Sequence, residues 1–299
     1  MTPPILIGLD WGTTSCRAYL IGEDRVLARN VDGPGILRVE NGAFGAALDA
    51  LIGPWIEAYG ALPVVLSGMI GSRQGWAEAP YTRCPATADD IVRALVRIDH
   101  GGRSLALVPG LSTENAGMPD VMRGEETQIA GALALSGQDS GLFLLPGTHS
   151  KWADVRAGRI VSFRTFMTGE VFAALKDHTI LGRLMRDDSA STVDTAVFAR
   201  GVAEAAALPS AGSLLNRIFA ARTYGLMDKL DDVALGDYLS GLLIGAEIAD
   251  ATRGHRGPVT IIASPLLAGR YNVALRQLGR AGSFAAEDCV AAGHRLIGR

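Results

Sequence analysis

A short pattern that occurs twice constrains the fold of this 299-residue chain more than any other feature. An apolar segment ends at Asp10 and is followed by Gly12-Thr13-Thr14-Ser15 and a second apolar segment. The same order returns around Pro146-Gly147-Thr148-His149-Ser150-Lys151. Each copy predicts a strand, a Gly/Thr turn and a second strand. Two halves that open in the same way indicate an internal duplication, with the boundary just before Gly141.

Both turns have the chemistry of an anion-binding loop. Glycine lets the backbone approach a phosphate without a Cβ clash, and the N–H groups of a turn can form a nest to which residues 13–15 add hydroxyl donors. Lys151 adds a positive charge to the second turn, where His149 could also touch a phosphate. Asp10, at a strand end, is well placed to orient metal-bound water. The alternative is that both are ordinary hairpin turns.

Composition limits the classes of partner. Hydrophobic residues make up 48% of the chain and charged residues 20%, which is typical of a globular protein. A net charge of −3 argues against nucleic acid or an anionic membrane as the main partner. The apolar stretches fall short of the roughly 18 residues of a membrane span, and the N-terminus lacks the pattern of a signal peptide. The three cysteines form no CxxC pair, so we expect a cytoplasmic protein.

Two regions carry candidate substrate residues. The apolar run 63–67 predicts a buried strand, and the Gly-punctuated loop after it contains Arg73, Gln74 and Trp76. Loops at strand ends line crevices, so Arg73 could hold an anionic group while Gln74 and Trp76 line a sugar pocket. Arg123 is suited to a bidentate contact with a carboxylate. The alternatives are a structural turn with a packed tryptophan and a surface arginine.

Apolar spacing predicts the helices of the chain. They are expected at residues 42–58, 87–98, 125–135, 169–175, 192–206, 213–224, 234–253, 264–278 and 289–296.

The turns resemble the two phosphate loops of the actin, hexokinase and Hsp70 superfamily. Five segments taken together resemble the 2-dehydro-3-deoxygalactonokinase family, and the resemblance spans residues 5 to about 296. The segments are GLDWGTTSCRAYL, PDVMRGEETQIAGAL, LLPGTHSKW, FRTFMTGEVFAAL and YLSGLLIGAEI.

The resemblance implies an α/β fold of two ribonuclease-H-like domains with a central cleft, the actin-like ATPase fold. Residues 1–140 would form the N-terminal domain, on the side of the sugar acid and the first phosphate turn, and residues 141–299 the nucleotide domain. The family uses ATP to phosphorylate the 6-hydroxyl of 2-dehydro-3-deoxy-D-galactonate, and Asp10 would orient Mg²⁺ through water. A kinase for another sugar or sugar acid, an ATPase activator and a non-catalytic sensing module remain alternatives. A homodimer is expected only because two-fold pairs are common.

The resemblance also implies a catalytic carboxylate ahead of the second turn. Related sugar kinases place an aspartate there, often as Gly-Asp-Gln at a helix start, and this chain has Gly124-Glu125-Glu126. Glu125 is therefore the predicted base, with Glu126 and Asp120 as rivals. The alternative is that the two glutamates only stabilise the helix N-terminus by their charge. The adenosine-binding turn of the superfamily, which usually carries paired glycines, would fall at Ala263-Ser264, so Ser264 is the candidate nucleotide contact.

Overall fold

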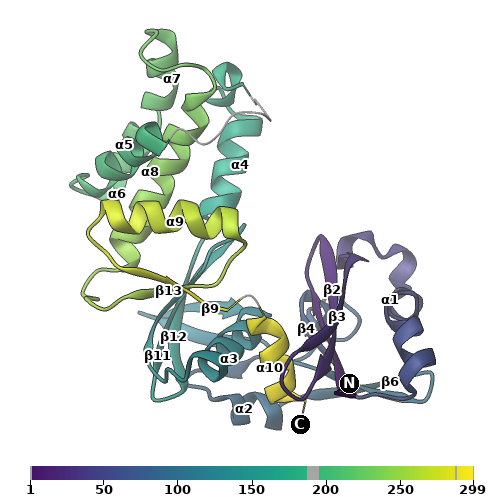
Figure 1. Cartoon of the computed structure of the whole chain (residues 1–299). Coiled ribbons are helices and arrows are strands. Elements are labelled where there is room, and N and C mark those ends of the chain that lie inside the picture. The colour runs from purple at the N-terminus through teal and green to yellow at the C-terminus, as the bar shows by residue number, and fades with distance from the viewer. Residues whose placement is uncertain (1, 187–194, 287, 299) are drawn as a thin grey trace. The chain divides into compact units, whose positions relative to one another are not determined.

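The computed structural model describes residues 2–186, 195–286 and 288–298, and the chain divides into two compact units (Figure 1). Unit 1 comprises Met1–Ser140, Ala153–Phe163 and Ala285–Arg299, and unit 2 comprises Gly141–Trp152 and Arg164–Phe284. The boundary predicted before Gly141 lies at the first change of unit. Residues 153–163 and the C-terminal segment are grouped with unit 1.

Unit 1 is built on a six-stranded sheet of order β3-β2-β1-β4-β7-β6. The first three strands are antiparallel, β4 and β7 run parallel to β1, and β6 pairs antiparallel with β7 at the edge. Their bounds are β1 (Pro4–Trp11), β2 (Ser15–Gly22), β3 (Val26–Pro34), β4 (Val64–Gly68), β6 (Val96–His100) and β7 (Arg103–Leu107). Because β1 and β4 are parallel, their carboxyl ends meet at one edge of the sheet.

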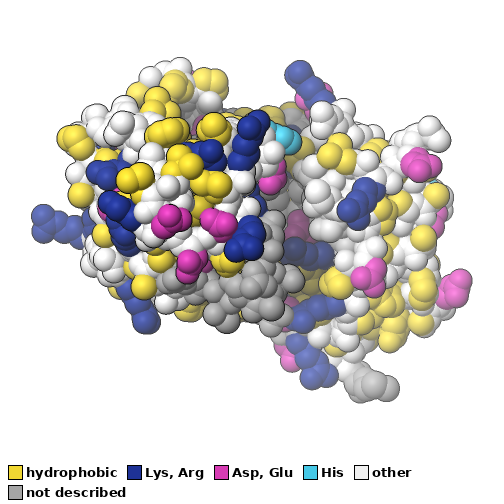
Figure 2. Space-filling view, turned by 90° about the horizontal axis from the view of Figure 1, so that it is seen from above, with side chains coloured by type: hydrophobic (Ala, Val, Ile, Leu, Met, Phe, Trp, Pro, Cys, Tyr) yellow, Lys and Arg dark blue, Asp and Glu magenta, His cyan; other side chains and the backbone are white. Residues whose placement is uncertain are grey.

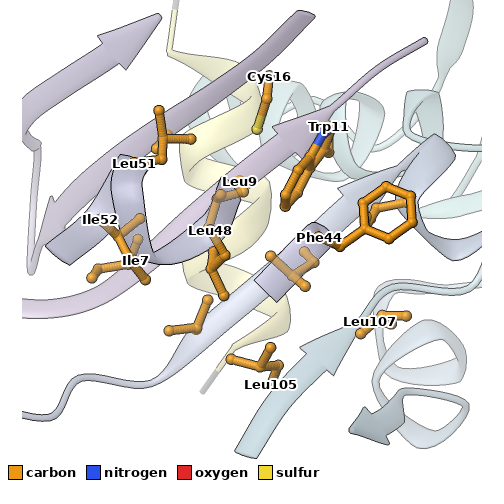
Figure 3. Packing of buried hydrophobic residues seen from close by; sticks show 14 of the residues in the cluster. Ile7, Leu9, Trp11, Cys16, Phe44, Leu48, Leu51, Ile52, Leu105 and Leu107 are labelled. Atoms are coloured by element: carbon orange, nitrogen blue, oxygen red, sulfur yellow. The ribbon is translucent and has the colours of Figure 1, made fainter. Parts of the chain in front are cut away.

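Helix α1 (Phe44–Tyr59) packs its apolar face on this sheet. Figure 3 shows Leu48, Leu51 and Ile52 of α1 directed at side chains of β1 and β2. Trp11, at the end of β1, meets the ring of Phe44 edge to face at 6.0 Å. Each of these side chains is at most 8% exposed, and the removal of their apolar surface from water stabilises unit 1.

Two helices of unit 1 approach each other closely, α3 (Glu125–Ser136) and α10 (Cys289–Ile297). A Cβ atom on Gly131 would lie 1.7 Å from the Cys289 oxygen, and one on Gly293 would lie 2.0 Å from the Thr127 oxygen. The two glycines therefore let the backbones of α3 and α10 lie in direct contact, which fixes the position of α3 against α10.

The rest of unit 1 contains a small sheet and short helices. The sheet has the order β5-β8-β9, and the hairpin of β8 and β9 was not foreseen from the sequence. The bounds are β5 (Thr82–Arg83), β8 (Leu111–Asn115), β9 (Met118–Met122), α2 (Ala88–Arg93), η1 (Ile36–Arg38), η2 (Glu40–Gly42) and η3 (Met69–Gly71).

Unit 2 contains β10 (Gly141–Leu145), β13 (Val259–Ile261) and β14 (Gly282–Phe284), which are parallel. With β11 (Ser150–Arg156) and β12 (Arg159–Phe166) they give the order β12-β11-β10-β13-β14. This is the order of the first five strands of the larger sheet, with each hairpin in the same place, as the predicted duplication requires.

Helices α5 (Thr195–Ala206), α8 (Ala234–Ala251) and α9 (Pro265–Gln277) pack on this sheet around a buried cluster that includes Trp152 and Tyr271. The further helices are α4 (Thr168–His178), η4 (Gly182–Leu184), α6 (Ala211–Arg217) and α7 (Ala220–Leu226). Figure 2 looks onto the α7 end of unit 2, where hydrophobic side chains lie among Lys and Arg at the surface.

Most predicted helices are present, with two corrections. The helix predicted over 87–98 is wrong beyond Arg93, because Val96 and Ile98 alternate with polar residues and pair with β7 instead. The helix predicted over 213–224 is two helices that meet near Phe219. The predicted start of a helix at residue 192 lies outside the described residues. In the described part of the chain, every helix is too short or too polar to cross a lipid bilayer.

Candidate active site

Asp10 lies in a gap lined by glycines in unit 1. The register of β1 and β4 places it beside Ser67. A Cβ atom on Gly68 would lie 3.4 Å from Asp10 Oδ1, and one on Gly124 would lie 3.9 Å from it. Both glycines have positive φ, 89° and 107°, a conformation that other residues rarely adopt. Burial raises the pKa of Asp10 and nearby Arg17 partly lowers it, so a cation at this carboxylate would favour the charged form.

Helix α10 contacts β1 and β4 next to Asp10 through the side chain of His294. His294 is fully buried, and its Nε2 lies 2.8 Å from Ser67 Oγ. Burial lowers the pKa of His294 to about 3, so the imidazole is neutral and shares one hydrogen bond with the serine hydroxyl. Gly8 packs flat on the same ring, because a Cβ there would lie 2.4 Å from His294 Nδ1. The backbone beneath Asp10 is thus fixed by a buried polar contact.

The start of α3 brings two glutamates next to Gly124, and their surroundings differ. Glu126 is 0% exposed; its Oε2 accepts the Gly124 N–H at 2.7 Å and its Oε1 accepts the Thr127 hydroxyl at 3.0 Å. Burial, with a smaller contribution from the charge of Glu125, raises the pKa of Glu126 to about 8. Glu125 is half-buried and accepts the Arg123 N–H at 2.9 Å. Of the two carboxyl groups, only that of Glu125 can reach solvent.

Asp120 belongs to a different element. It lies on β9 of the small sheet, opposite Thr113, and its Oδ1 accepts the Val121 N–H at 2.8 Å.

The first Gly/Thr turn is shaped by backbone contacts. Gly12 N–H donates to the Ser15 oxygen at 2.9 Å, and η1 donates the N–H groups of Ile36 and Leu37 to the carbonyls of residues 12 and 13 at 3.0 and 3.2 Å. A Cβ atom on Gly35 would lie 2.3 Å from the Thr14 carbonyl carbon. The side chains of Thr13 and Thr14 remain exposed, so their hydroxyls are accessible to a ligand.

The second turn, in unit 2, is covered by the start of α4. A Cβ atom on Gly169 would lie 2.4 Å from the Gly147 oxygen, and Glu170 N–H donates to the Thr148 oxygen at 3.0 Å. His149 Nε2 lies 2.5 Å from Glu170 Oε2, with both side chains about half exposed. Residues 147–149 are exposed, so this turn also has an accessible face.

A buried hydrogen-bond network lies beneath the second turn. Ser150 is 0% exposed, and its Oγ lies 3.0 Å from the Tyr271 hydroxyl. That hydroxyl donates to Glu247 Oε2 at 2.8 Å, and Trp152 Nε1–H donates to Oε1 at 2.7 Å. Since the tyrosine proton is directed at Glu247, the Ser150 proton points inward as well. Ser150 therefore supports the turn from inside, and its hydroxyl is not presented to a ligand.

Lys151 and Glu247 are also buried beneath the second turn. Lys151 is 6% exposed and donates to Thr165 Oγ1 at 2.8 Å. Burial raises the pKa of Glu247, and the hydrogen bonds from Thr168, Trp152, Tyr271 and Ser150 act in the opposite direction. Glu247 was not singled out from the sequence. The available signal was a lone carboxylate in the apolar stretch 238–248 of α8.

The predicted substrate residues of the Gly-punctuated loop lie in different settings. Arg73 is exposed and pairs with Glu78 at 3.0 Å, and Gln74 is exposed as well. Trp76 stacks on Phe44 at 6.3 Å and meets His100 at 5.2 Å, so its ring takes part in the packing of unit 1.

Arg123 has unusual surroundings. Its guanidinium lies over the Tyr81 ring at 4.4 Å and donates to the Ala79 oxygen at 2.8 Å. Its Nε and Nη1 are buried and have no acceptor among the described residues. Buried donors without acceptors are costly, so an anionic group at Arg123 would relieve this cost.

Ser264, the predicted nucleotide contact, is exposed before α9, with Pro265 at the first helical position. Its side chain makes no capping hydrogen bond. No group of three or more His, Cys, Asp or Glu side chains suited to holding a metal occurs among the described residues. A metal held mainly through water needs only one or two carboxylates, and Asp10 fits that role.

Comparison with known proteins identifies related chains over nearly the whole length. A model of the 2-keto-3-deoxy-galactonokinase family matches residues 10–297. A 2-dehydro-3-deoxygalactonokinase of Escherichia coli is 35% identical over 276 residues, which cover 91% of this chain and 90% of the relative. A Rhizobium meliloti protein named a probable 2-dehydro-3-deoxygalactonokinase is 36% identical over 274 residues, covering 91% and 89%.

Solved structures agree with the fold. A crystal structure from Sinorhizobium meliloti, assigned by name to the same kinase, matches with a TM-score of 0.90 and 35% identity, covering 98% of this chain and 97% of the other. The activator of the 2-hydroxyisocaproyl-CoA dehydratase of Clostridium difficile matches with a TM-score of 0.50 and 12% identity over 98% and 93% of the chains. At that identity the likeness concerns the fold alone. The predicted α/β, actin-like fold is confirmed by these likenesses and by the repeated strand order.

Proposed function

Because the chain belongs to the 2-keto-3-deoxy-galactonokinase family, we propose that it transfers a phosphoryl group from ATP to the 6-hydroxyl of 2-dehydro-3-deoxy-D-galactonate. The products are 2-dehydro-3-deoxy-6-phospho-D-galactonate and ADP, so the enzyme would act in galactonate catabolism. We place the reaction in the cytoplasm, where ATP is available. Association into a homodimer stays a prediction.

One observation carries the proposal beyond the family name: Asp10, Gly68 and Gly124 meet at one point of unit 1. A carboxylate bounded by glycines has no neighbouring Cβ atoms at these positions, so it can offer its charge to a ligand. Phosphoryl transfer depends mainly on such positioning and charge stabilisation.

Glu125 is the base that this geometry favours. A general base must be ionised and must reach the proton that it accepts. Glu126 meets neither condition near neutral pH, because it is fully buried, hydrogen-bonded and has a pKa of about 8. Asp120 remains a rival on a separate element. Glu125 would take the proton of the sugar hydroxyl while its neighbour Glu126 holds the Gly124 backbone.

Asp10 is the proposed anchor for Mg²⁺ through water. The carboxylate is half-buried with its pKa raised, so a divalent cation would supply the compensating charge. When bound, Mg²⁺ neutralises charge on the phosphates of the donor. In this chain, the backbones of Gly68 and Gly124 would hold the Asp10 carboxylate in position.

The remaining predicted residues divide into substrate and nucleotide contacts. Arg123, with two buried donors lacking acceptors, is the proposed partner of the substrate carboxylate. Arg73 and Gln74 are accessible for further contacts, and Trp76 would act through packing. The two Gly/Thr turns, residues 12–15 and 147–151, are the proposed phosphate-binding elements, and within the second turn Ser150 acts as an internal support. Ser264 is proposed on the nucleotide side.

A coupled assay of ADP release against a panel of 2-keto-3-deoxy sugar acids tests the function. We expect turnover to be highest with 2-dehydro-3-deoxy-D-galactonate and to require both ATP and Mg²⁺. Faster turnover of another sugar acid would reassign the substrate while keeping the reaction class. ATP hydrolysis without an acceptor would favour an ATPase activator, and absence of turnover with every acceptor would favour a non-catalytic sensing module.

A further inference from the structure

The buried histidine of α10, His294, contacts the two strands whose ends form the gap around Asp10. Its Nε2 lies 2.8 Å from Ser67 Oγ on β4, and the Ser67 hydroxyl donates to the Leu9 oxygen on β1 at 3.3 Å. Because that hydroxyl gives its proton to the Leu9 oxygen, its own oxygen accepts the Nε2–H of the neutral ring. Leu9 directly precedes Asp10, and Ser67 directly precedes Gly68. One chain of hydrogen bonds therefore joins α10 to both strands at the gap.

The ring of His294 is closely surrounded. A Cβ atom on Gly8 would lie 2.4 Å from Nδ1, and the centroid of the Tyr19 ring lies 6.4 Å from that of the imidazole. Nδ1 is buried and has no hydrogen-bond partner among the described residues. An unpaired buried nitrogen costs free energy, so an apolar side chain would serve packing alone at least as well. The feature that an apolar residue could not supply is the Nε2–H that Ser67 accepts.

The preceding residue of α10 contacts the start of α3. A Cβ atom on Gly293 would lie 2.0 Å from the Thr127 oxygen. Thr127 is fully buried in the first turn of α3, two residues after Glu125. Figure 1 shows α10 beside α3. Two consecutive residues of α10 thus lie against the strand end that carries Asp10 and against the helix start that carries Glu125.

We propose that His294 is a positioning residue for phosphoryl transfer, which acts through Ser67 to hold Asp10 in place relative to the start of α3. This inference rests on the proposed kinase function and extends it to a side chain that touches no substrate. Hydrogen bonds define geometry more sharply than apolar packing, because they depend on direction as well as distance. A displacement of about 1 Å in a reacting group can cost 10²-fold in rate, so loss of this chain of hydrogen bonds should appear in catalysis.

Single substitutions in the whole chain test the inference. His294→Leu removes the Nε2–H and Ser67→Ala removes the hydroxyl. In each variant we expect kcat to fall by at least about tenfold, and Mg²⁺ to increase the calorimetric affinity for ADP by less than in the unaltered protein. His294→Gln keeps an N–H at the same number of bonds from Cα, so it should recover most of the turnover. Thr252→Val is the control, since it removes a buried hydroxyl that donates to the Ile248 oxygen at 2.8 Å in unit 2, and its kcat should be unchanged.

The double variant Ser67→Ala/His294→Leu separates positioning from stability. Removing both partners of a buried hydrogen bond can be nearly neutral for folding, whereas removing one leaves the other unsatisfied. We expect the melting temperature of the double variant to lie closer to that of the unaltered protein than those of the single variants do, while its kcat stays low. Recovery of kcat together with the melting temperature would overturn the inference and leave His294 a purely structural role.

The single variants can overturn the inference as well. Unaltered kcat in Ser67→Ala and His294→Leu, with melting temperatures showing that both fold, would do so and leave the kinase function standing. A His294→Gln variant as impaired as His294→Leu would also overturn it, because the Nε2–H would then not be the feature that matters. If His294→Leu does not fold, Ser67→Ala decides alone, since it removes a single oxygen atom. Failure of the unaltered protein to release ADP with any sugar acid would overturn the kinase function, and this inference with it.

Discussion

The two Gly/Thr turns are alike in sequence, yet they are supported differently. Both follow the first strand of a unit, and both are approached by the backbone of a later glycine, Gly35 in unit 1 and Gly169 in unit 2. Beneath the first turn the supports are backbone hydrogen bonds from η1. Beneath the second they are buried side chains, Ser150, Tyr271 and Glu247.

The carboxylates near the two turns also differ in their access to solvent. Next to the first turn, Asp10 and Glu125 have at least partial access to solvent, whereas the carboxylate under the second turn, Glu247, is buried and engaged in hydrogen bonds. The difference fits our proposal that the two turns of the duplicated hairpin bind phosphate and that the acid–base chemistry resides in unit 1. Unit 2 then contributes binding, and substitutions in the two units should change different kinetic constants.

The largest effect is expected from Glu125→Gln. Loss of a general base costs about 10²- to 10⁴-fold, so kcat should fall by that amount while binding of ADP is unchanged. Glu170→Gln is the matched control, since Glu170 lies in the first turn of α4 in unit 2. Its kcat should change by less than about tenfold. A kcat near wild type in Glu125→Gln would move the base to Asp120, and a larger loss in Glu170→Gln would place the acid–base chemistry in unit 2.

Alanine at Gly35 or Gly169 should have the next largest effect. The added Cβ would overlap backbone atoms at 2.3 and 2.4 Å, so the turn beneath must shift. Displacement of about 1 Å at a binding element can cost 10²-fold, and we expect kcat/KM for ATP to fall by roughly 10- to 100-fold in both variants. Gly53→Ala is the control, because nothing lies within 4 Å of the added Cβ. An effect at Gly169 alone would show that the first turn does not bind phosphate.

A smaller effect separates the supports of the two turns. Tyr271→Phe removes the hydroxyl between Ser150 and Glu247, and we expect the KM for ATP to rise several-fold while the KM for the sugar acid stays constant. Tyr238→Phe removes a comparable buried hydroxyl, which donates to Glu204 at 2.6 Å away from the turn. Both changes should lower the free energy of unfolding by about 1–3 kcal/mol, since each removes one hydrogen bond to a carboxylate. Equal KM values in the two variants would mean that the network serves stability alone.

Much of the fold could be predicted from the sequence because many of its elements depend on local patterns. The repeated hairpin, the apolar spacing of α1 and the start of α3 at Glu125 are set by neighbouring residues, and all are present. The helix predicted over 87–98 failed where pairing with β7 outweighed helical spacing at Val96 and Ile98. Local pattern does not specify such long-range pairing.

The residues that support the two turns could not be predicted from the sequence either, because their roles also depend on long-range contacts. Gly35 and Gly169 matter because of what lies opposite them, and nothing in their flanking residues shows it. The turn motif predicts that Ser150 binds phosphate. In the structure Ser150 is buried and contacts Tyr271, 121 positions away, so it supports the turn from inside. A side chain's direction within a turn depends on its packing partners.

The smallest effect concerns the pH dependence of stability in unit 1. Burial gives Glu126 a pKa of about 8 in the folded chain against an ordinary value of 4.5, so the folded state binds this proton more tightly. Its contribution to stability is fully present below about pH 4.5 and is lost as pH rises toward about 8. Glu126→Gln removes the titration and keeps an oxygen that can accept the Gly124 N–H. We therefore expect the melting temperature of the unaltered protein to fall relative to Glu126→Gln between about pH 5 and about pH 9, with Glu57→Gln, at an exposed position of α1, as the control for loss of one charge. Parallel melting curves across that range would mean that Glu126 is ionised in the fold, which would reopen the choice between the two glutamates as the base.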